Sequence, residues 1–200
     1  MQVTVIDYKA GNLTSVVKAL RHLGAEVEVT DRPEPLARAE RIVLPGVGHF
    51  AATRRLDEAG LTPAIREAIG RRIPFLGICV GMQWLYAGST EAPDQPGLSQ
   101  FPEMIERFPD TEEKVPHVGW NEIAPSATSH LLSGVKSGEF AYFTHSWRAP
   151  ITAAAAAATT YIQPFASAVE QGNVFGVQFH PEKSGETGLK ILRNFLELVK

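Results

Sequence analysis

The sequence has almost no cysteine, since Cys79 is the only one among 200 residues. A single thiol excludes a disulfide within the chain, and no group of cysteine and histidine residues has the spacing of a zinc site. We therefore expect no bound metal. Whatever Cys79 does, it does as a lone thiol.

The sequence also lacks a basic cluster and a long apolar segment. Its formal net charge is -3, which gives no electrostatic reason to expect nucleic acid or an anionic membrane as a partner. The apolar run around residues 153–158 is too short and too weakly hydrophobic to span a bilayer. The N-terminal residues MQVTVIDYKAGN have no basic region before an apolar one, so they do not resemble a signal peptide. We expect a cytoplasmic protein.

What is present is the composition of an ordinary globular protein, with 44% hydrophobic and 20% charged residues. Short apolar runs alternate with helical patterns in the first half, which predicts an α/β fold with an open, mostly parallel sheet and helices on both faces. The second half predicts an antiparallel β extension and a final amphipathic helix. No linker or repeat is visible, so residues 1–200 are predicted to form one domain. The expected strands are 3–6, 27–29, 41–44, 73–78, 140–143, 159–162, 165–169 and 174–179; the expected helices are 12–23, with Asn12 as the candidate cap, 62–69 and 185–199. Gln171-Gly172-Asn173 is expected to form a hairpin turn, and residues 153–158 fit helix or strand.

Cys79 stands in the pentapeptide GICVG at 77–81, which has the spacing G-x-C-x-G of a nucleophile elbow. In such an elbow a strand turns abruptly into a helix with the nucleophile at the apex, and side chains at the two glycine positions would collide. The apolar run before Cys79 and the residues 82–86 after it fit a strand and a helix. Free cysteine is also one of the most often buried residues, so the pentapeptide alone leaves a core role equally open.

A catalytic cysteine needs a base, and His180 is the best placed of the six histidines. It follows an apolar strand pattern and precedes Pro181, which cannot continue a ladder, so His180 is expected at the end of the strand. Glu182 stands two residues further on and can face the same way, orienting the imidazole. Together with Cys79 these residues form a candidate Cys-His-Glu triad, although His-Pro-Glu alone is more often a loop.

The third requirement is a pair of donors for an oxyanion. The backbone amide of Val80 follows the nucleophile directly. Gly46, Val47 and Gly48 come after a predicted parallel strand, so they lie at the edge of the sheet where open α/β folds bind ligands. A simple Pro-Gly turn explains this loop equally well.

As a set, these motifs resemble the class I glutamine amidotransferases. GICVGMQ at 77–83, FGVQFHPEKS at 175–184 and PGVG at 45–48 carry the resemblance, which extends from Val3 to the final expected helix. Within that family, the chain is similar to the glutaminase subunits of imidazole glycerol phosphate synthases of histidine biosynthesis. The segments that carry this finer similarity are MQVTVIDYKAGNLTSV at the N-terminus, VPHVGWNE at 115–122 and YFTHSW at 142–147.

The resemblance implies a role for each matching residue. Cys79 would attack the side-chain amide of L-glutamine, and His180, oriented by Glu182, would shuttle the proton. Val80 and the loop of Gly46, Val47 and Gly48 would hold the oxyanion, the loop after its backbone has reoriented. The residues that match glutamine-binding positions are Gln83, Glu91 and Ser146.

The resemblance also implies a partner, because ammonia is useful only if it reaches an acceptor site. One glutaminase domain fills the chain, so a separate (β/α)8-barrel cyclase subunit would use the ammonia, and no cofactor is implied. We expect the docking face to include His117, Trp120, Asn121 and Tyr142, with core packing as the alternative for Trp120. Open alternatives are a glutaminase for another synthase (of GMP, anthranilate or pyridoxal phosphate), a γ-glutamyl hydrolase or peptidase, and a binding module without activity.

The sequence departs from the family pattern at two loops. The family often has a glycine after Gly97-Leu98, where this chain has Ser99-Gln100-Phe101. The usual glycine between Tyr161 and Phe165 is replaced by Ile162-Gln163-Pro164. Both departures lie outside the catalytic motifs, so they raise a question about loop geometry and not about chemistry.

Overall fold

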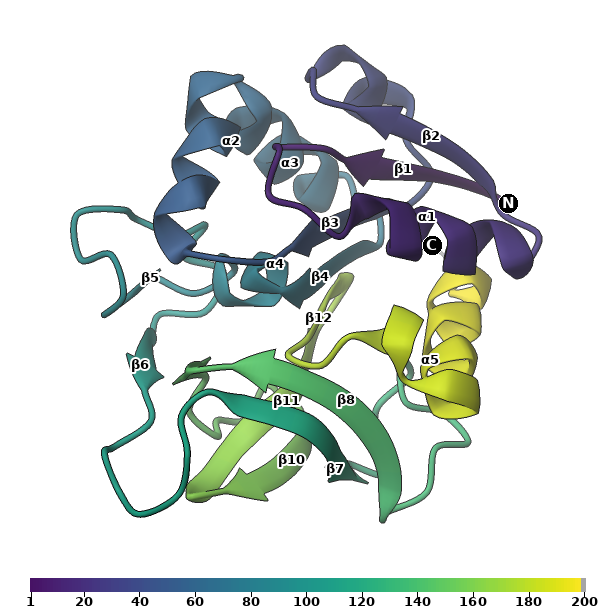
Figure 1. The fold of residues 1–200 in the computed structure, drawn as a ribbon. Helices are drawn as coiled ribbons and strands as arrows, with labels where there is room; N and C mark the ends of the chain where they lie inside the picture. Colours follow the sequence, from purple (N-terminus) through teal and green to yellow (C-terminus); the bar gives the residue numbers. More distant parts are fainter. Residues whose placement is uncertain (199–200) are drawn as a thin grey trace.

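A mixed sheet of nine strands runs through the computed structural model, which describes residues 1–198 (Figure 1). Its first five strands are parallel neighbours and its last four join it antiparallel. The predicted fold class is therefore confirmed. In spatial order the strands are β2 (Glu26–Thr30), β1 (Gln2–Ile6), β3 (Ile42–Gly46), β4 (Phe75–Cys79), β12 (Val174–Val177), β11 (Gln163–Gln171), β10 (Ala155–Tyr161), β7 (His117–Pro125) and β8 (Glu139–His145).

Helices cover both faces of the parallel part. α1 (Leu13–His22) and α5 (Gly185–Glu197) lie side by side on one face, and α3 (Leu61–Gly70) with the short α2 (Arg54–Glu58) lies on the other (Figure 1). Neighbouring residues of one strand serve opposite faces, as the two-residue period of a strand requires. Val43 packs with the α1 and α5 side, whereas Ile42 and Leu44 pack with the α3 side.

Two local expectations need correction. Asn12 does not cap α1, because its backbone is left-handed with φ 58° and its side chain makes no capping hydrogen bond. The strand predicted at 174–179 ends at Val177, and the chain then enters a 3-10 turn, η3 (Pro181–Lys183). The final helix ends at Glu197, and the part of the prediction that falls on residue 199 lies outside the described residues.

The alanine run at 153–158 is resolved as strand from Ala155 onward. β10 lies between β11 and β7, where its small side chains pack into the sheet. The hairpin expected around Gln171-Gly172-Asn173 is confirmed, since Gln171 pairs with Val174. The prediction missed the long strand β7 and the short helix α2. Other elements that were not expected are a small three-stranded sheet of β5 (Gly88–Ser89), β6 (Met104–Arg107) and β9 (Trp147–Arg148), and 3-10 turns η1 (Glu34–Arg38) and η2 (Phe50–Thr53).

The parallel register brings the expected site to one edge of the sheet. Gly46, the last residue of β3, is the direct partner of Cys79, the last residue of β4. β12 pairs with the other side of β4, so the chain that follows it emerges beside Cys79. No helix in the described part of the chain is long and apolar enough to cross a membrane.

Candidate active site

Cys79 lies at the apex of a sharp turn between β4 and α4 (Val80–Gln83). Its φ of 54° and ψ of -110° fall outside the three regions open to L-residues, so the backbone is strained there. The side chain is 4% exposed. The helix expected to run through Tyr86 ends at Gln83, which leaves only one turn after the cysteine.

The two flanking glycines are required by the packing of the turn. A Cβ atom on Gly77 would lie 2.5 Å from the carbonyl oxygen of Gly81. One on Gly81 would overlap the carbonyl oxygen of Leu44 on the neighbouring strand. The backbone of the elbow therefore lies so close to β3 that only glycine fits at position 81.

His180 and Glu182 form a buried pair at the end of the segment after β12. The Nδ1 atom of His180 lies 2.9 Å from Oε1 of Glu182, and neither side chain is more than 1% exposed. The backbone N–H of His180 donates to the carbonyl of Tyr142, which holds this segment against β8. The expected pairing of these two side chains is present in the structure.

The other ring nitrogen of His180, Nε2, is turned toward the cysteine. It has no hydrogen-bond partner of good geometry among residues 1–198. Burial alone lowers the pKa of an imidazole, but the Cys79 sulfur and the Glu182 carboxylate outweigh burial and raise the pKa of His180 to about 9. A protonated His180 at neutral pH stabilises a thiolate beside it.

Two further side chains belong to this cluster, and sequence reasoning missed both. Asn12 donates from Nδ2 to Oε1 of Glu182, so its side chain contacts the His180–Glu182 pair and not the start of α1. Gln178 donates from Nε2 to the Cys79 sulfur at 3.7 Å. Asn12 stands in the N-terminal segment and Gln178 in VQFHPE, two stretches that carry the family resemblance.

A cavity of about 250 Å³ opens in front of Cys79. Glu91 and Ser146 line it, together with Gln83, so the three expected substrate-binding residues come together. Oε2 of Glu91 accepts the backbone N–H of Phe50 at 2.8 Å. Both amide hydrogens of Gln83 are used, because Nε2 lies 3.1 Å from the Trp147 carbonyl and 3.1 Å from Oε1 of Gln178.

The loop expected to form the oxyanion hole is bound elsewhere in this structure. Val47 and Gly48 line the cavity, but the N–H of Val47 donates to the carbonyl of Ala10 at 3.1 Å. Val80 also lines the cavity, at the start of α4, where the first amides of a helix have no partner inside the helix. The Val80 amide thus lies at the cavity without a partner inside the helix, whereas the Val47 amide is occupied by Ala10.

The residues expected at a docking face lie on β7 and β8, but not all of them are on the surface. Trp120 is 54% exposed, so it is not a core residue, and its ring packs edge-on against Tyr142 at 6.0 Å. Asn121 is partly exposed, but its side chain lies on the same side of β7 as that of His117 and not on the side of Trp120. His117 is only 3% exposed and lies beneath this face, because its ring stacks on Tyr161.

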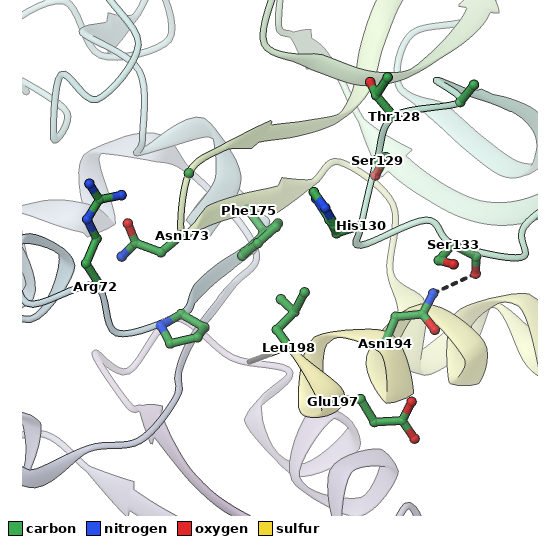
Figure 2. Close-up of a pocket in the computed structure, with 13 residues that line it drawn as sticks. Arg72, Thr128, Ser129, His130, Ser133, Asn173, Phe175, Asn194, Glu197 and Leu198 are labelled. Carbon is green, nitrogen blue, oxygen red and sulfur yellow. Dashed lines mark hydrogen bonds between the residues drawn. The ribbon is translucent and has the colours of Figure 1, made fainter. Parts of the chain in front are cut away.

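A larger cavity, of about 940 Å³, lies at the opposite, amino-terminal end of β4 and β12 (Figure 2). It contains no thiol, and its polar side chains already serve the fold. Ser129 and His130 both contact the carboxylate of Glu170. Asn194 donates to the carbonyls of Leu131 and Ser133, and Asn173 to those of Ile69 and Ile73. Residues 1–198 also contain no group of three His, Cys, Asp or Glu side chains that could hold a metal. The cavity at Cys79 is therefore the candidate active site.

The parts at Cys79 suit attack on a carbonyl carbon. A lone thiol faces an imidazole whose other nitrogen is held by a carboxylate, and a helix start supplies an amide where negative charge would develop. With a volume of about 250 Å³, the cavity is of a size for a substrate below drug size. This set of groups can perform acyl transfer through a thioester.

Comparison with known proteins agrees with this chemistry. The family model described as glutamine amidotransferase class-I matches residues 4–199. Proteins named imidazole glycerol phosphate synthase subunit HisH are similar over their full length. The one from Moorella thermoacetica is 45% identical (99% of this chain, 95% of the relative), the one from a Synechococcus species 46% (100% and 94%), and the one from Archaeoglobus fulgidus 41% (99% and 99%).

Solved structures show the same fold at lower sequence identity. A crystal structure of a glutamine amidotransferase superimposes with a TM-score of 0.77 at 21% identity, covering 98% of this chain and 97% of that one. A chain in the structure of PurLQS from Thermotoga maritima gives a TM-score of 0.75 at 18% identity, covering 100% and 99%.

Proposed function

Because the chain belongs to the class I glutamine amidotransferase family, we propose that it is the glutaminase subunit of an imidazole glycerol phosphate synthase. The observation that carries this proposal is the full-length similarity to relatives that bear this name, joined to a cavity that holds Cys79 beside His180. The reaction is hydrolysis of L-glutamine to glutamate and ammonia. We propose that residues 1–200 form one domain devoted to it.

The proposed mechanism begins with a thiolate–imidazolium pair of Cys79 and His180. The sulfur attacks the side-chain amide carbon of glutamine, and His180 gives its proton to the departing nitrogen, which leaves as ammonia. A γ-glutamyl thioester remains. His180, now neutral, takes a proton from water, the hydroxide attacks the thioester, and glutamate leaves with the thiolate restored. Glu182 keeps the ring oriented through Nδ1.

The cavity offers groups for the rest of the substrate. Oε1 of Glu91 accepts no hydrogen bond from residues 1–198 and lies 4.0 Å from Nε2 of the exposed His49, whereas Oε2 is held by the backbone of Phe50, so we propose Oε1 for the ammonium group of glutamine. Gln83 can contact the substrate through its carbonyl oxygen alone, since its amide hydrogens are already used. Ser146 completes the lining. For the oxyanion we propose the amide of Val80, joined by Val47 once its N–H leaves Ala10.

A partner subunit follows from the chemistry and from the relatives' names, which describe one subunit of a synthase. We propose that the partner is a (β/α)8-barrel cyclase that combines the ammonia with a nucleotide precursor, giving imidazole glycerol phosphate and an aminoimidazole carboxamide ribotide. The face of β7 and β8 supports docking, because three large apolar side chains are about half exposed on it: Val118, Trp120 and Phe140. The cytoplasmic location stays a prediction.

The replacement Cys79→Ala tests the role of the thiol. In the complex with a cyclase subunit, we expect glutamine-dependent synthesis to be abolished while synthesis from added ammonium salt continues, because the cyclase site is untouched. Product formation measured with each nitrogen source decides this. A variant that also loses the ammonia-dependent reaction, with the complex still assembled, would contradict the assigned role.

Specificity for the partner is tested by mixing the purified chain with candidate synthase subunits and following glutamate release. We expect slow turnover by the isolated chain and a rise when the barrel subunit carries its ligand, because the Val47 amide has to turn. Activation by a GMP, anthranilate or pyridoxal phosphate synthase instead would overturn the proposed pathway and leave the glutaminase chemistry intact.

A further inference from the structure

A continuous series of hydrogen bonds connects Asn121, on the side of β7 that carries His117, with the Cys79 sulfur. Nδ2 of Asn121 lies 3.2 Å from Nε2 of His117, and Nδ1 of His117 lies 3.1 Å from Nε2 of His145. Nδ1 of His145 lies 2.8 Å from the carbonyl oxygen of Trp147. The Trp147 carbonyl also accepts a hydrogen bond from Nε2 of Gln83, which donates a second one to Oε1 of Gln178. Nε2 of Gln178 in turn donates to the Cys79 sulfur.

The directions of these bonds fix the tautomers of both histidines. The Trp147 carbonyl can only accept, so His145 must carry its proton on Nδ1. A neutral imidazole has a single N–H, and Nε2 of His145 is therefore an acceptor. His117 must then carry its proton on Nδ1 in turn, which leaves its Nε2 to accept from the Asn121 amide. Each ring has one arrangement that satisfies every partner.

The packing around the two rings holds this arrangement in place. His117 stacks between Tyr161 at 4.1 Å and Phe143 at 4.8 Å, and His145 lies against Phe165 at 5.0 Å. Both histidines are at least 94% buried. Burial lowers the pKa of His117 to about 4 and that of His145 to about 3, so both rings are neutral at pH 7, as single-proton tautomers require.

We propose that His117 and His145 are positioning residues that hold the Trp147 carbonyl and the Gln83 amide behind the nucleophile, and that Asn121 anchors the far end of the series on β7. The proposal rests on the function proposed above. Neither histidine touches the sulfur through the series; both act through the carbonyl of Trp147. Gln83 bridges the Trp147 carbonyl and Gln178. Loss of the hydrogen bond from His145 to that carbonyl would therefore leave the Trp147 carbonyl and the Gln83 amide free to move, and both residues line the glutamine cavity.

The tautomers provide a test that does not depend on activity. In the chain labelled with ¹⁵N, we expect ring-nitrogen resonances at pH 7 that show His145 and His117 neutral, each protonated on Nδ1. Exposed His22 is the internal reference for a ring outside the series. A proton on Nε2 of His145, or a charged ring at pH 7, would overturn the proposal. This readout stands even if the chain proves to serve another synthase.

Two replacements of His117 test the link in the assembled synthase. His117→Phe keeps an aromatic ring between Tyr161 and Phe143 but removes the donor to His145. We expect the KM for glutamine to rise about three- to tenfold with kcat within about twofold, the loss of roughly one hydrogen bond in the binding site. His117→Asn restores a donor near the position of Nδ1, and we expect it to return KM to within about twofold of the original.

The comparison between the two variants separates positioning from simple destabilisation. A structural role alone predicts that both variants lower the melting temperature and leave the KM of the folded fraction unchanged, which would overturn the proposal. Equal KM values for His117→Phe and His117→Asn would overturn it too, because the donor would then be irrelevant. If His117→Phe fails to fold, Asn121→Ala tests the same series from its partly exposed end, with a shifted His117 resonance and a raised KM expected.

Discussion

Cys79 combines a strained backbone with a charged neighbour, and the two features act on the same atom. The backbone at φ 54° and ψ -110° lifts the sulfur out of the line of β4 toward His180. Strain of this kind costs about 1–3 kcal/mol and persists only where the surroundings enforce it. Here Gly77 and Gly81 enforce it, since both are closed in by neighbouring backbone. Folding energy is thus used to hold a thiol where an imidazolium can stabilise its charge.

The replacement Cys79→Ala should lower the pKa of His180. In the intact site, burial lowers that pKa, and the sulfur and Glu182 together raise it to about 9. Without the sulfur, burial is opposed by Glu182 alone. A ¹⁵N titration of the His180 ring should show a midpoint well below that of the unaltered chain, and an unchanged midpoint would mean that Cys79 does not interact with the ring.

Ser99 shows what the departures from the family pattern cost. Each of the two departing loops has a left-handed backbone at a residue that is not glycine, with φ 59° at Ser99 and φ 59° at Ile162. Glycine, the residue best suited to this conformation, is absent at both positions. Such a conformation costs an L-residue about 1–2 kcal/mol relative to glycine.

We expect Ser99→Gly to raise the free energy of unfolding by about 0.5–1 kcal/mol. The change relieves backbone strain in the folded state, and part of this gain is lost because glycine increases the entropy of the unfolded chain. Ser99 is exposed, so little packing is lost. Ser99→Ala is the matched control, because it keeps the Cβ atom and should bring no gain. Urea unfolding of the three proteins checks this, and equal stabilisation by both changes would contradict the account.

At the scale of single residues, sequence predicted what short-range patterns encode. Cys79, His180 and Glu182 each lie in a motif whose spacing carries its geometry. Asn12 was read as a helix cap, because nothing local shows that its side chain reaches a carboxylate 170 positions further on. The burial of His117 was missed for the same reason, since it depends on a ring from β10.

At the scale of elements, the elbow depends on close contact between α4 and the two strands beside it. Helix α4 has only four residues, so it cannot hold its own position through helix propensity. Its position comes from Gly81 against Leu44 of β3 and from Met82, which packs against Gly176 of β12. The sharp turn is thus a property of three neighbouring strands, although its sequence signal is a pentapeptide.

Gly81→Ala should therefore destabilise the protein by about 3 kcal/mol or more, because the added methyl group overlaps the Leu44 carbonyl and the backbone must shift. Gly70→Ala, at the end of α3, is the control. Nothing lies within 4 Å of a Cβ atom there and φ is not positive, so that change should be neutral or slightly stabilising. Thermal unfolding of both variants distinguishes a site-specific overlap from a general cost of replacing glycine.

The elements themselves were predictable where the pattern was strong. The parallel strands read as buried apolar runs because both of their faces are covered. The alanine run was ambiguous because alanine favours helix locally, and pairing with β11 and β7 decides for strand. The short strands β5, β6 and β9 could not be predicted, since two to four residues are too few to show the alternation of apolar and polar residues that identifies a strand.

At the scale of the whole molecule, the site lies where the parallel sheet meets its antiparallel extension. Cys79 ends a parallel strand, whereas His117 and His145 come from the antiparallel pair of β7 and β8 (Figure 1). The two parts of the sheet are joined through β12, whose following segment carries His180. The candidate active site and the proposed docking face thus belong to one continuous sheet, and a shift of β7 relative to β4 would change the shape of the cavity at Cys79.

The buried histidines should give stability an optimum near pH 6.5. The pKa of His117 lies at about 4 and that of His145 at about 3, below the unfolded value of 6.5, so the unfolded chain binds more protons as pH falls and stability is lost from about pH 6.5 downward. His180 acts in the opposite direction. Its pKa of about 9 means that its contribution is complete below pH 6.5 and is lost as pH rises toward 9.

Asp7 and Glu139 also have lowered pKa values, and both titrate below about pH 4.5. They therefore add to the loss of unfolding free energy only at the most acidic pH values. Urea unfolding from pH 5 to 9 should show the free energy of unfolding falling on the acidic and on the alkaline side of the optimum, by an amount on the order of a few kcal/mol on each side. Cys79→Ala should reduce the loss of stability on the alkaline side, because it removes one cause of the raised pKa of His180. His117→Phe should reduce the loss on the acidic side, because it removes one buried histidine with a lowered pKa. An unchanged loss on the acidic side in His117→Phe would mean that the buried histidine pair does not control stability in this range.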